Sequence, residues 1–112
     1  MSYRLMKASI LFLLLTVAAN MLSIPVFAAD GGKETFQTKL CPTCHGEAGK
    51  ALYPNYPNLA GHDRDYIIRQ FTDIRSGARK NGVTILMRSF PTLKTVDAEQ
   101  IGAVADYLSQ LE

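Results

Sequence analysis

The sequence has few of the residues from which sites and cross-links are usually made. Its 112 residues include only two cysteines and two histidines, and no tryptophan. Two cysteines exclude a framework of several disulfides, which small exported domains often use to supplement a small core. No segment alternates polar and apolar residues as a half-buried strand does, and no internal repeat is present. The chain is therefore expected to be helical and to need another stabilising group.

The N-terminus has the pattern of a secretory signal peptide. Arg4 and Lys7 precede an apolar run over residues 10–19, which leads to a small-residue cleavage site at Ala28. An uncleaved membrane anchor is the alternative, but polar residues and a proline interrupt the stretch before it reaches the ~20 apolar residues that span a bilayer. We therefore predict a signal peptide at residues 1–28 and one mature domain at residues 29–112.

The mature domain carries no net formal charge. Residues 29–112 contain ten Lys or Arg and ten Asp or Glu, because Arg4 and Lys7 leave with the signal peptide. The composition therefore gives no indication of a nucleic-acid or acidic-lipid partner. A domain of this length buries a modest core, and such domains usually depend on a disulfide, a metal or a cofactor.

Helical patterns dominate the mature domain. A short helix is expected over residues 33–40, and residues 63–76 place apolar side chains at three- and four-residue steps before Gly77 ends the helix. The last helix follows Asp97, which forms a capping box with Gln100. The remaining segments are expected to be a long loop over residues 46–61 and an irregular stretch over residues 78–92. The sequence therefore predicts an all-α fold.

Both cysteines and both histidines lie within one short segment. Cys41, Cys44 and His45 form a C-x-x-C-H motif, and His62 follows in the next loop. A C-x-x-C is used as a redox dithiol, as half of a zinc site, or for covalent haem attachment. The redox dithiol belongs near a βαβ pattern, which is absent, and three zinc ligands within five consecutive residues suit a tetrahedron poorly. The histidine directly after the second cysteine, in an exported chain, favours covalent haem.

Beyond this motif, the chain resembles the class I monohaem c-type cytochromes, in particular their small bacterial periplasmic branch. The resemblance covers residues 31–112 and rests on "CPTCHG", "YPNLAGHDRDYIIRQFTDIRSGAR" and "VDAEQIGAVADYL". It implies the cytochrome c fold, in which three main helices and long loops wrap around one covalently bound haem c. It also implies that Gly32 and Phe36 meet the terminal helix near Ala105 and Leu108.

The resemblance further implies a set of site residues. Cys41 and Cys44 would hold the haem covalently, and His45 would be one axial ligand of its iron. The carbonyl of Pro57 would orient the His45 ring, and Arg79 would contact the haem propionates.

Met87 is the expected second axial ligand. It is the only methionine after residue 28, and we expect it in an irregular segment that bends over the haem. The alternative is a buried gap-filler, a role that methionine often plays. His62 is a less favoured candidate for this ligand, because imidazole ligates iron readily. Relatives commonly carry glutamine at its position.

A few other side chains have two plausible roles each. Tyr53 and Tyr56 would either line the haem crevice or cover the apolar side of the loop. Arg75 and Lys80, beside Arg79, would either face solvent or dock an acidic partner.

The predicted function is periplasmic electron transfer rather than catalysis. A haem with His and Met as axial ligands has no open site for a substrate and is suited to accepting and donating one electron. The expected partners are an oxidase, a reductase or a dehydrogenase, met by a monomer or in a weak complex, without membrane insertion after signal cleavage. The alternative is a dedicated haem subunit bound permanently to one oxidoreductase. A five-coordinate gas-binding or peroxidase-like protein is a more distant candidate, against which Met87 argues.

Overall fold

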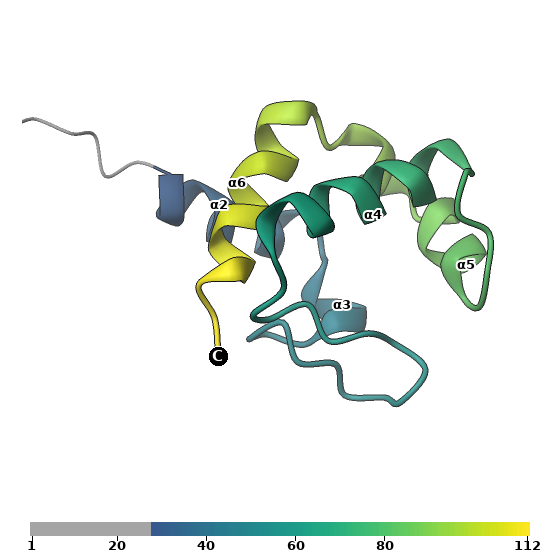
Figure 1. The fold of residues 1–112 in the computed structure, drawn as a ribbon, viewed down its shortest axis with the longest axis horizontal. Coiled ribbons are helices and arrows are strands. Elements are labelled where there is room, and N and C mark those ends of the chain that lie inside the picture. Colours follow the sequence, from purple (N-terminus) through teal and green to yellow (C-terminus); the bar gives the residue numbers. More distant parts are fainter. Residues whose placement is uncertain (1–27) are drawn as a thin grey trace, which may run out of the picture.

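The computed structural model describes residues 28–112, which form a helical structure without strands in that range (Figure 1). The elements are α2 (Ala28–Thr38), α3 (Pro42–His45), α4 (Arg64–Ser76), α5 (Thr84–Ser89), the 3-10 helix η2 (Pro91–Thr95) and α6 (Ala98–Ser109). The all-α prediction is confirmed over these residues. The predicted signal peptide lies outside them, except for Ala28. Within the described range, no helix is long and apolar enough to cross a bilayer.

Helices α2 and α6 form the closest helix pair in the structure (Figure 1). A Cβ atom on Gly32 would overlap the backbone carbonyl of Ala103 and press on the side chain of Tyr107, so only glycine permits this approach. Phe36 is fully buried, and its ring centroid lies 5.9 Å from that of Tyr107. Gly32 meets the terminal helix as expected, with its nearest atoms on Ala103 and Tyr107, within two residues of Ala105 and Leu108. Phe36 does share one core cluster with the latter two residues.

Helix α4 has the predicted ends and the predicted buried face. The carboxylate of Asp63 caps its N-terminus by accepting a hydrogen bond from the Tyr66 backbone N–H at 3.0 Å. Gly77 ends it in the left-handed conformation, with φ of 82°. Phe71 and Ile74 are buried on the face that this pattern predicts. The local signals therefore place α4 correctly to within one residue.

Helix α6 is capped as predicted. The Asp97 carboxylate accepts a hydrogen bond from the Gln100 backbone N–H at 2.8 Å, and the Gln100 side chain accepts one from the Asp97 N–H at 3.1 Å. Val96 and Ile101, on either side of the cap, are both buried in the core cluster. These contacts fix the start of the helix that packs on α2.

The segment before α6 differs from the prediction. Residues 78–92 were expected to be irregular, but they contain α5 and the start of η2. The Thr84 hydroxyl donates to the Asn81 carbonyl at 2.8 Å and thereby closes the turn before α5. Pro91 then starts η2, where its missing N–H costs no helical hydrogen bond. Met87 consequently lies on a short helix and not in a loop.

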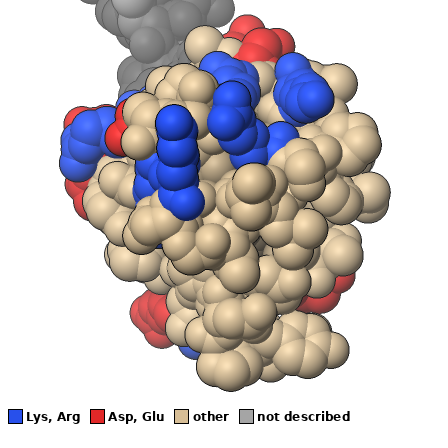
Figure 2. Space-filling view, turned by 90° about the vertical axis from the view of Figure 1, so that its right-hand side faces the viewer, with Lys and Arg blue, Asp and Glu red and all other residues tan. Residues whose placement is uncertain are grey.

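Charged side chains are unevenly placed around this segment. Figure 2 views the molecule from the side on which Figure 1 shows α5, and Lys and Arg gather over the upper part of this face. The centre and lower part of the face are mostly neutral, with acidic side chains near the edges.

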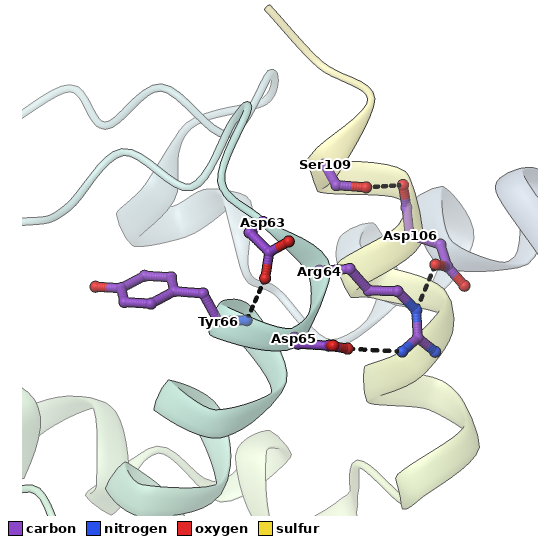
Figure 3. Close-up of polar contacts among 6 residues, drawn as sticks. All are labelled: Asp63, Arg64, Asp65, Tyr66, Asp106 and Ser109. Carbon is purple, nitrogen blue, oxygen red and sulfur yellow. Dashed lines mark hydrogen bonds and ion pairs between the residues drawn. The ribbon is translucent and has the colours of Figure 1, made fainter.

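An exposed polar network joins α4 to α6 (Figure 3). The Arg64 Nε donates to Asp106 Oδ1 at 2.6 Å, and its Nη1 donates to Asp65 Oδ1 at 3.3 Å. The hydrogen bond and charge of Asp106 raise the pKa of Arg64. The Ser109 hydroxyl donates to the Asp106 carbonyl at 2.9 Å. Because solvent surrounds the pair, its contribution to stability is small.

Candidate functional site

The C-x-x-C-H motif forms a single helical turn. Pro42 occupies the first turn of α3, and the His45 N–H donates to the Cys41 carbonyl at 3.1 Å. This spacing brings Cys41, Cys44 and His45 to the same side of the chain, since residues three and four apart are neighbours on a helix. Gly46 ends the turn with φ of 77°, where a Cβ atom would collide with the backbone of Lys50. The glycine after the histidine is therefore required by the fold.

His45 is buried and has one firm hydrogen-bond partner. Its Nδ1 lies 3.0 Å from the carbonyl oxygen of Pro57. A carbonyl only accepts, so Nδ1 carries the proton and Nε2 is the ring nitrogen left with a free electron pair. Burial lowers the pKa of His45, and the Pro57 carbonyl partly opposes this. The ring is therefore held neutral, which is the form that binds metals.

The long loop after the motif is ordered by its own hydrogen bonds. The Asn58 side-chain oxygen accepts from the Ala51 N–H at 2.8 Å, and the Gly49 carbonyl accepts from the Leu59 N–H at 2.7 Å. These contacts hold the two sides of the loop together around Pro57. The ordered loop therefore holds the Pro57 carbonyl against the His45 ring.

A cavity of about 360 Å³ opens beside the motif. Its wall contains Cys41, Cys44, His45 and Met87, although Met87 lies far from the motif in sequence. A second lobe of about 130 Å³ shares Cys41, His45 and Met87 with the first and extends toward the core. The remaining wall is largely apolar. A large, mainly hydrophobic group that is attached through two thiols and ligated by two further side chains would suit these walls.

Cys41 lacks the lowered pKa of a reactive thiol. Both cysteines are free in this structure, and burial raises the pKa of Cys41 to about 11. Reactive C-x-x-C motifs instead lower the pKa of one cysteine to form a thiolate. Among the described residues, no group of three or more His, Cys, Asp or Glu side chains is arranged to hold a metal ion.

Four other predicted residues line the cavity or lie close to it. Met87 is half-buried and packs against the core cluster. Tyr56 lines the main cavity, whereas Tyr53 is 60% exposed and contacts Tyr56 edge-on. His62 is exposed, borders only the smaller lobe, and has its ring centroid 5.1 Å from that of Tyr66. The structure therefore groups Met87 and Tyr56 with the motif and leaves His62 at its margin.

Arg79 also lies in the cavity wall, held by two neighbours that the sequence analysis does not identify. Its Nη1 donates to Gln70 Oε1 at 2.7 Å, and its Nε donates to Asn81 Oδ1 at 2.9 Å. Both partners are neutral, so these contacts fix the guanidinium without neutralising it. Gln70 lies within the helix predicted over residues 63–76. No local pattern in the sequence links it to Arg79. The Arg75 guanidinium turns elsewhere and donates to the Val96 carbonyl.

Comparisons with known proteins agree with this site. A model of the family described as "Cytochrome C oxidase, cbb3-type, subunit III" matches residues 27–108. The cytochrome c-554(548) of Halomonas halodenitrificans is 38% identical over 75% of this chain and 96% of its own length. The thiosulfate dehydrogenase electron acceptor of Stutzerimonas stutzeri is 36% identical over 85% of this chain and 45% of its own length. The crystal structure of reduced cytochrome c4 from Pseudomonas stutzeri superposes with a TM-score of 0.61 at 26% identity, over 75% of this chain and 45% of that one.

These findings define the molecule as a small class I c-type cytochrome with the cytochrome c fold. The chain belongs to the family described as "Cytochrome C oxidase, cbb3-type, subunit III". Its cofactor is a covalently bound haem c with iron, and it transfers electrons through that haem. The chain spans nearly all of the Halomonas cytochrome, but less than half of the S. stutzeri protein and of the cytochrome c4 structure.

Proposed function

We propose that residues 29–112 act in the periplasm as a one-electron carrier whose haem c is attached to Cys41 and Cys44. In this proposal His45 and Met87 are the axial ligands. The observation that supports it is the shared cavity, whose wall contains all four residues. The haem supplies the change between ferrous and ferric iron, and the chain supplies the binding, the orientation and the electrostatic environment.

The chain's own residues prepare this site in different ways. The Pro57 carbonyl holds the His45 ring in the tautomer that leaves Nε2 free for the iron. Met87, which lies far from the motif in sequence, supplies a soft thioether. A thioether ligand favours the ferrous state of the iron. Arg79, fixed by Gln70 and Asn81, places an uncompensated positive charge in the cavity wall, where the haem propionates would pair with it.

The sixth ligand is tested by Met87→Ala. Loss of the thioether should lower the reduction potential by a fraction of the ~0.8 V range that axial ligands control. It should also open the iron to carbon monoxide and cyanide and abolish the long-wavelength sulfur-to-iron absorption band. Leu86→Ala is the matched control, because it shortens a neighbouring cavity residue without removing sulfur. An unchanged low-spin spectrum and potential in Met87→Ala would refute the ligand assignment and make His62→Ala the next variant.

Export is tested by removing residues 1–28. The truncated chain should accumulate in the cytoplasm without covalent haem, and a foreign signal peptide should restore the holoprotein. Pyridine haemochrome spectra of the two cell fractions measure this. Equal covalent haem in the unexported chain would contradict the periplasmic assignment.

Permanent attachment to one oxidoreductase is the alternative. It is supported by the name of the S. stutzeri relative, which identifies that protein as the electron acceptor of a dehydrogenase. Size-exclusion chromatography of the native periplasmic fraction separates the two proposals. A free carrier should elute at the mass of one chain, whereas a subunit should co-elute with its enzyme.

A further inference from the structure

Helix α5 has few buried side chains of its own to fix its direction. It has six residues, and a helix this short is not stable in isolation. Thr84 is its buried residue, whereas Ile85 is 75% exposed and Leu86 is 51% exposed. The hydrogen bond from the Thr84 hydroxyl to Asn81 lies at one end of the helix and leaves the other end free to turn. The position of Met87 therefore depends on further contacts between α5 and the rest of the chain.

Thr84, Met87 and Arg88 share one side of α5, because residues three and four positions apart are neighbours on a helix. On this side Thr84 is buried, and Met87 is half-buried and packs against the core cluster. Helix α5 lies beside the C-terminal end of α4 (Figure 1). A rotation of α5 about its own axis would consequently move Met87 and Arg88 together, and a contact that holds one of them also holds the other.

The Arg88 guanidinium lies against Gly77, at the end of α4. A Cβ atom on Gly77 would lie 2.6 Å from Arg88 Nη1 and 2.8 Å from its Cζ, so the guanidinium fills the space that a side chain would take. Gly77 is buried, although it follows the last residue of a surface helix. The end of a helix favours a cation, because its last carbonyls carry partial negative charge. Within residues 28–112 no carboxylate forms an ion pair with Arg88, so the end of α4 is the environment that orients it.

We propose that Arg88 is a positioning residue for Met87. Its guanidinium, held against Gly77, fixes the rotation of α5 and keeps the Met87 thioether at the cavity wall. Arg88 acts through Met87, since it lines neither lobe of the cavity. The effect on the iron rests on the proposed axial ligation by Met87, whereas the contact between Arg88 and Gly77 is present in the chain itself.

The test measures imidazole binding to the ferric holoprotein. Imidazole is neutral, and it reaches the iron when the Met87 thioether moves away. Arg88→Ala should raise the binding rate by about fivefold or more, the change expected when one favourable contact is lost. Arg88→Lys keeps the charge without the flat guanidinium and should give a smaller increase. Lys80→Ala is the control for charge, because it removes an exposed cation from the turn before α5, and it should change the rate by less than about twofold.

A second variant reaches the same contact from the α4 side. Gly77→Ala should displace the guanidinium and raise the imidazole rate as Arg88→Ala does, and combining the two should add little, because both remove one contact. Gly61→Ala is the matched control for backbone strain. Its φ of 74° is also left-handed, but a Cβ atom there would meet the Leu111 carbonyl at 3.3 Å, away from α5. Gly61→Ala should therefore leave the imidazole rate within about twofold of the wild type.

Denaturant unfolding separates a positioning role from a general effect on stability. In Arg88→Ala the long-wavelength sulfur-to-iron band should disappear at a lower denaturant concentration than the helical circular dichroism, because α5 opens locally. Band and dichroism shifting together would overturn the proposal, as would an unchanged imidazole rate, equal acceleration by Lys80→Ala, or effects of Gly77→Ala and Arg88→Ala that multiply in the double variant. Met87→Ala distinguishes the two failures. Rapid imidazole binding to Met87→Ala with a wild-type rate in Arg88→Ala refutes the positioning role alone, whereas a retained sulfur-to-iron band in Met87→Ala refutes the axial ligand and with it both proposals.

Discussion

Two regions of the cytochrome hold its cavity in different ways. The first, which we call the frame, consists of residues 28–45 together with α4 and α6, and it meets the cavity through Cys41 and His45. Helices α2 and α6 are in such close contact that a single added carbon at Gly32 would collide with the backbone of Ala103. The second, which we call the strap, consists of residues 78–96 and carries Met87. It consists of a short helix, a 3-10 helix and their turns, and it contributes only Leu93 and Val96 to the buried core cluster.

The strap is joined to the frame by the buried side chains of Leu93 and Val96, which belong to the core cluster, and by hydrogen bonds, among them those at one residue, Lys39. Lys39 accepts a hydrogen bond from the Thr92 hydroxyl at its carbonyl oxygen, at 2.7 Å, and its Nζ donates to Thr95 Oγ1 at 2.8 Å. Such bonds contribute about 1 kcal/mol each, far less than the packed interior of the frame. The comparison indicates that attachment and folding depend on the frame, whereas the state of the iron depends on the strap.

The largest effect is expected from Cys41→Ala/Cys44→Ala. Without thioether bonds, the small domain loses the group that fills its cavity, and little folded protein should accumulate. Periplasmic protein levels and pyridine haemochrome spectra measure this outcome. Met87→Ala is the matched variant in the strap and should keep both covalent bonds to the haem. A stable, haem-free fold of the double variant would show that the frame does not need the cofactor.

A large effect on stability is expected from Gly32→Ala. The new methyl group would meet the Ala103 carbonyl and Tyr107, and overpacking of this kind costs about 1–3 kcal/mol. Gly31→Ala is the control, because a Cβ atom there meets nothing within 4 Å and alanine favours the helix by about 1 kcal/mol. Denaturant unfolding should therefore move in opposite directions for the two neighbours. Equal destabilisation would show that α2 is sensitive throughout and that the close contact is not the cause.

The frame was largely predictable from sequence, and the strap was not. The capping box of Asp97 and Gln100 and the end of α4 at Gly77 depend on a few adjacent residues, so their patterns identify them. The α5 helix begins where the Thr84 hydroxyl donates a hydrogen bond to the Asn81 carbonyl. Its first residues are β-branched and have low helix propensity, so propensity alone does not predict this helix. In the candidate site, too, residues close in sequence were predictable and contacts between distant segments were not.

The spacing of Cys41, Cys44 and His45 indicates their shared purpose, because one helical turn brings them together. Gln70 and Arg79 meet only because α4 and the following turn fold back on one another. Contacts of this kind depend on tertiary structure, and no local sequence pattern predicts them. The sequence indicates Met87 as the second ligand because no other methionine remains after residue 28. Its position on a helix differs from the irregular segment that the sequence predicts.

A moderate effect is expected from Thr92→Val, which removes the hydrogen bond to the Lys39 carbonyl while keeping the side-chain shape. The loss should cost about 1 kcal/mol and loosen the strap. Cyanide should consequently bind the ferric protein faster, because its entry requires movement of Met87. Thr38→Val is the control, since that hydroxyl makes only an exposed hydrogen bond of 3.4 Å within the frame. If cyanide binds both variants at the wild-type rate, the link between Lys39 and Thr92 does not restrain the strap.

The smallest effect is expected at the surface of the frame, from Arg64→Gln. The guanidinium joins α4 to Asp106 of α6 at 2.6 Å, but both side chains face solvent (Figure 3). Exposed ion pairs of this type contribute little, because water solvates each partner well and ordering two side chains costs entropy. The midpoint of thermal unfolding should therefore fall by less than in Thr92→Val, and high salt should remove most of the difference. The reduction potential should stay unchanged, because this pair does not border the cavity. A loss of stability as large as that of Gly32→Ala would show that polar contacts, and not the close approach of α2 and α6, hold the frame together.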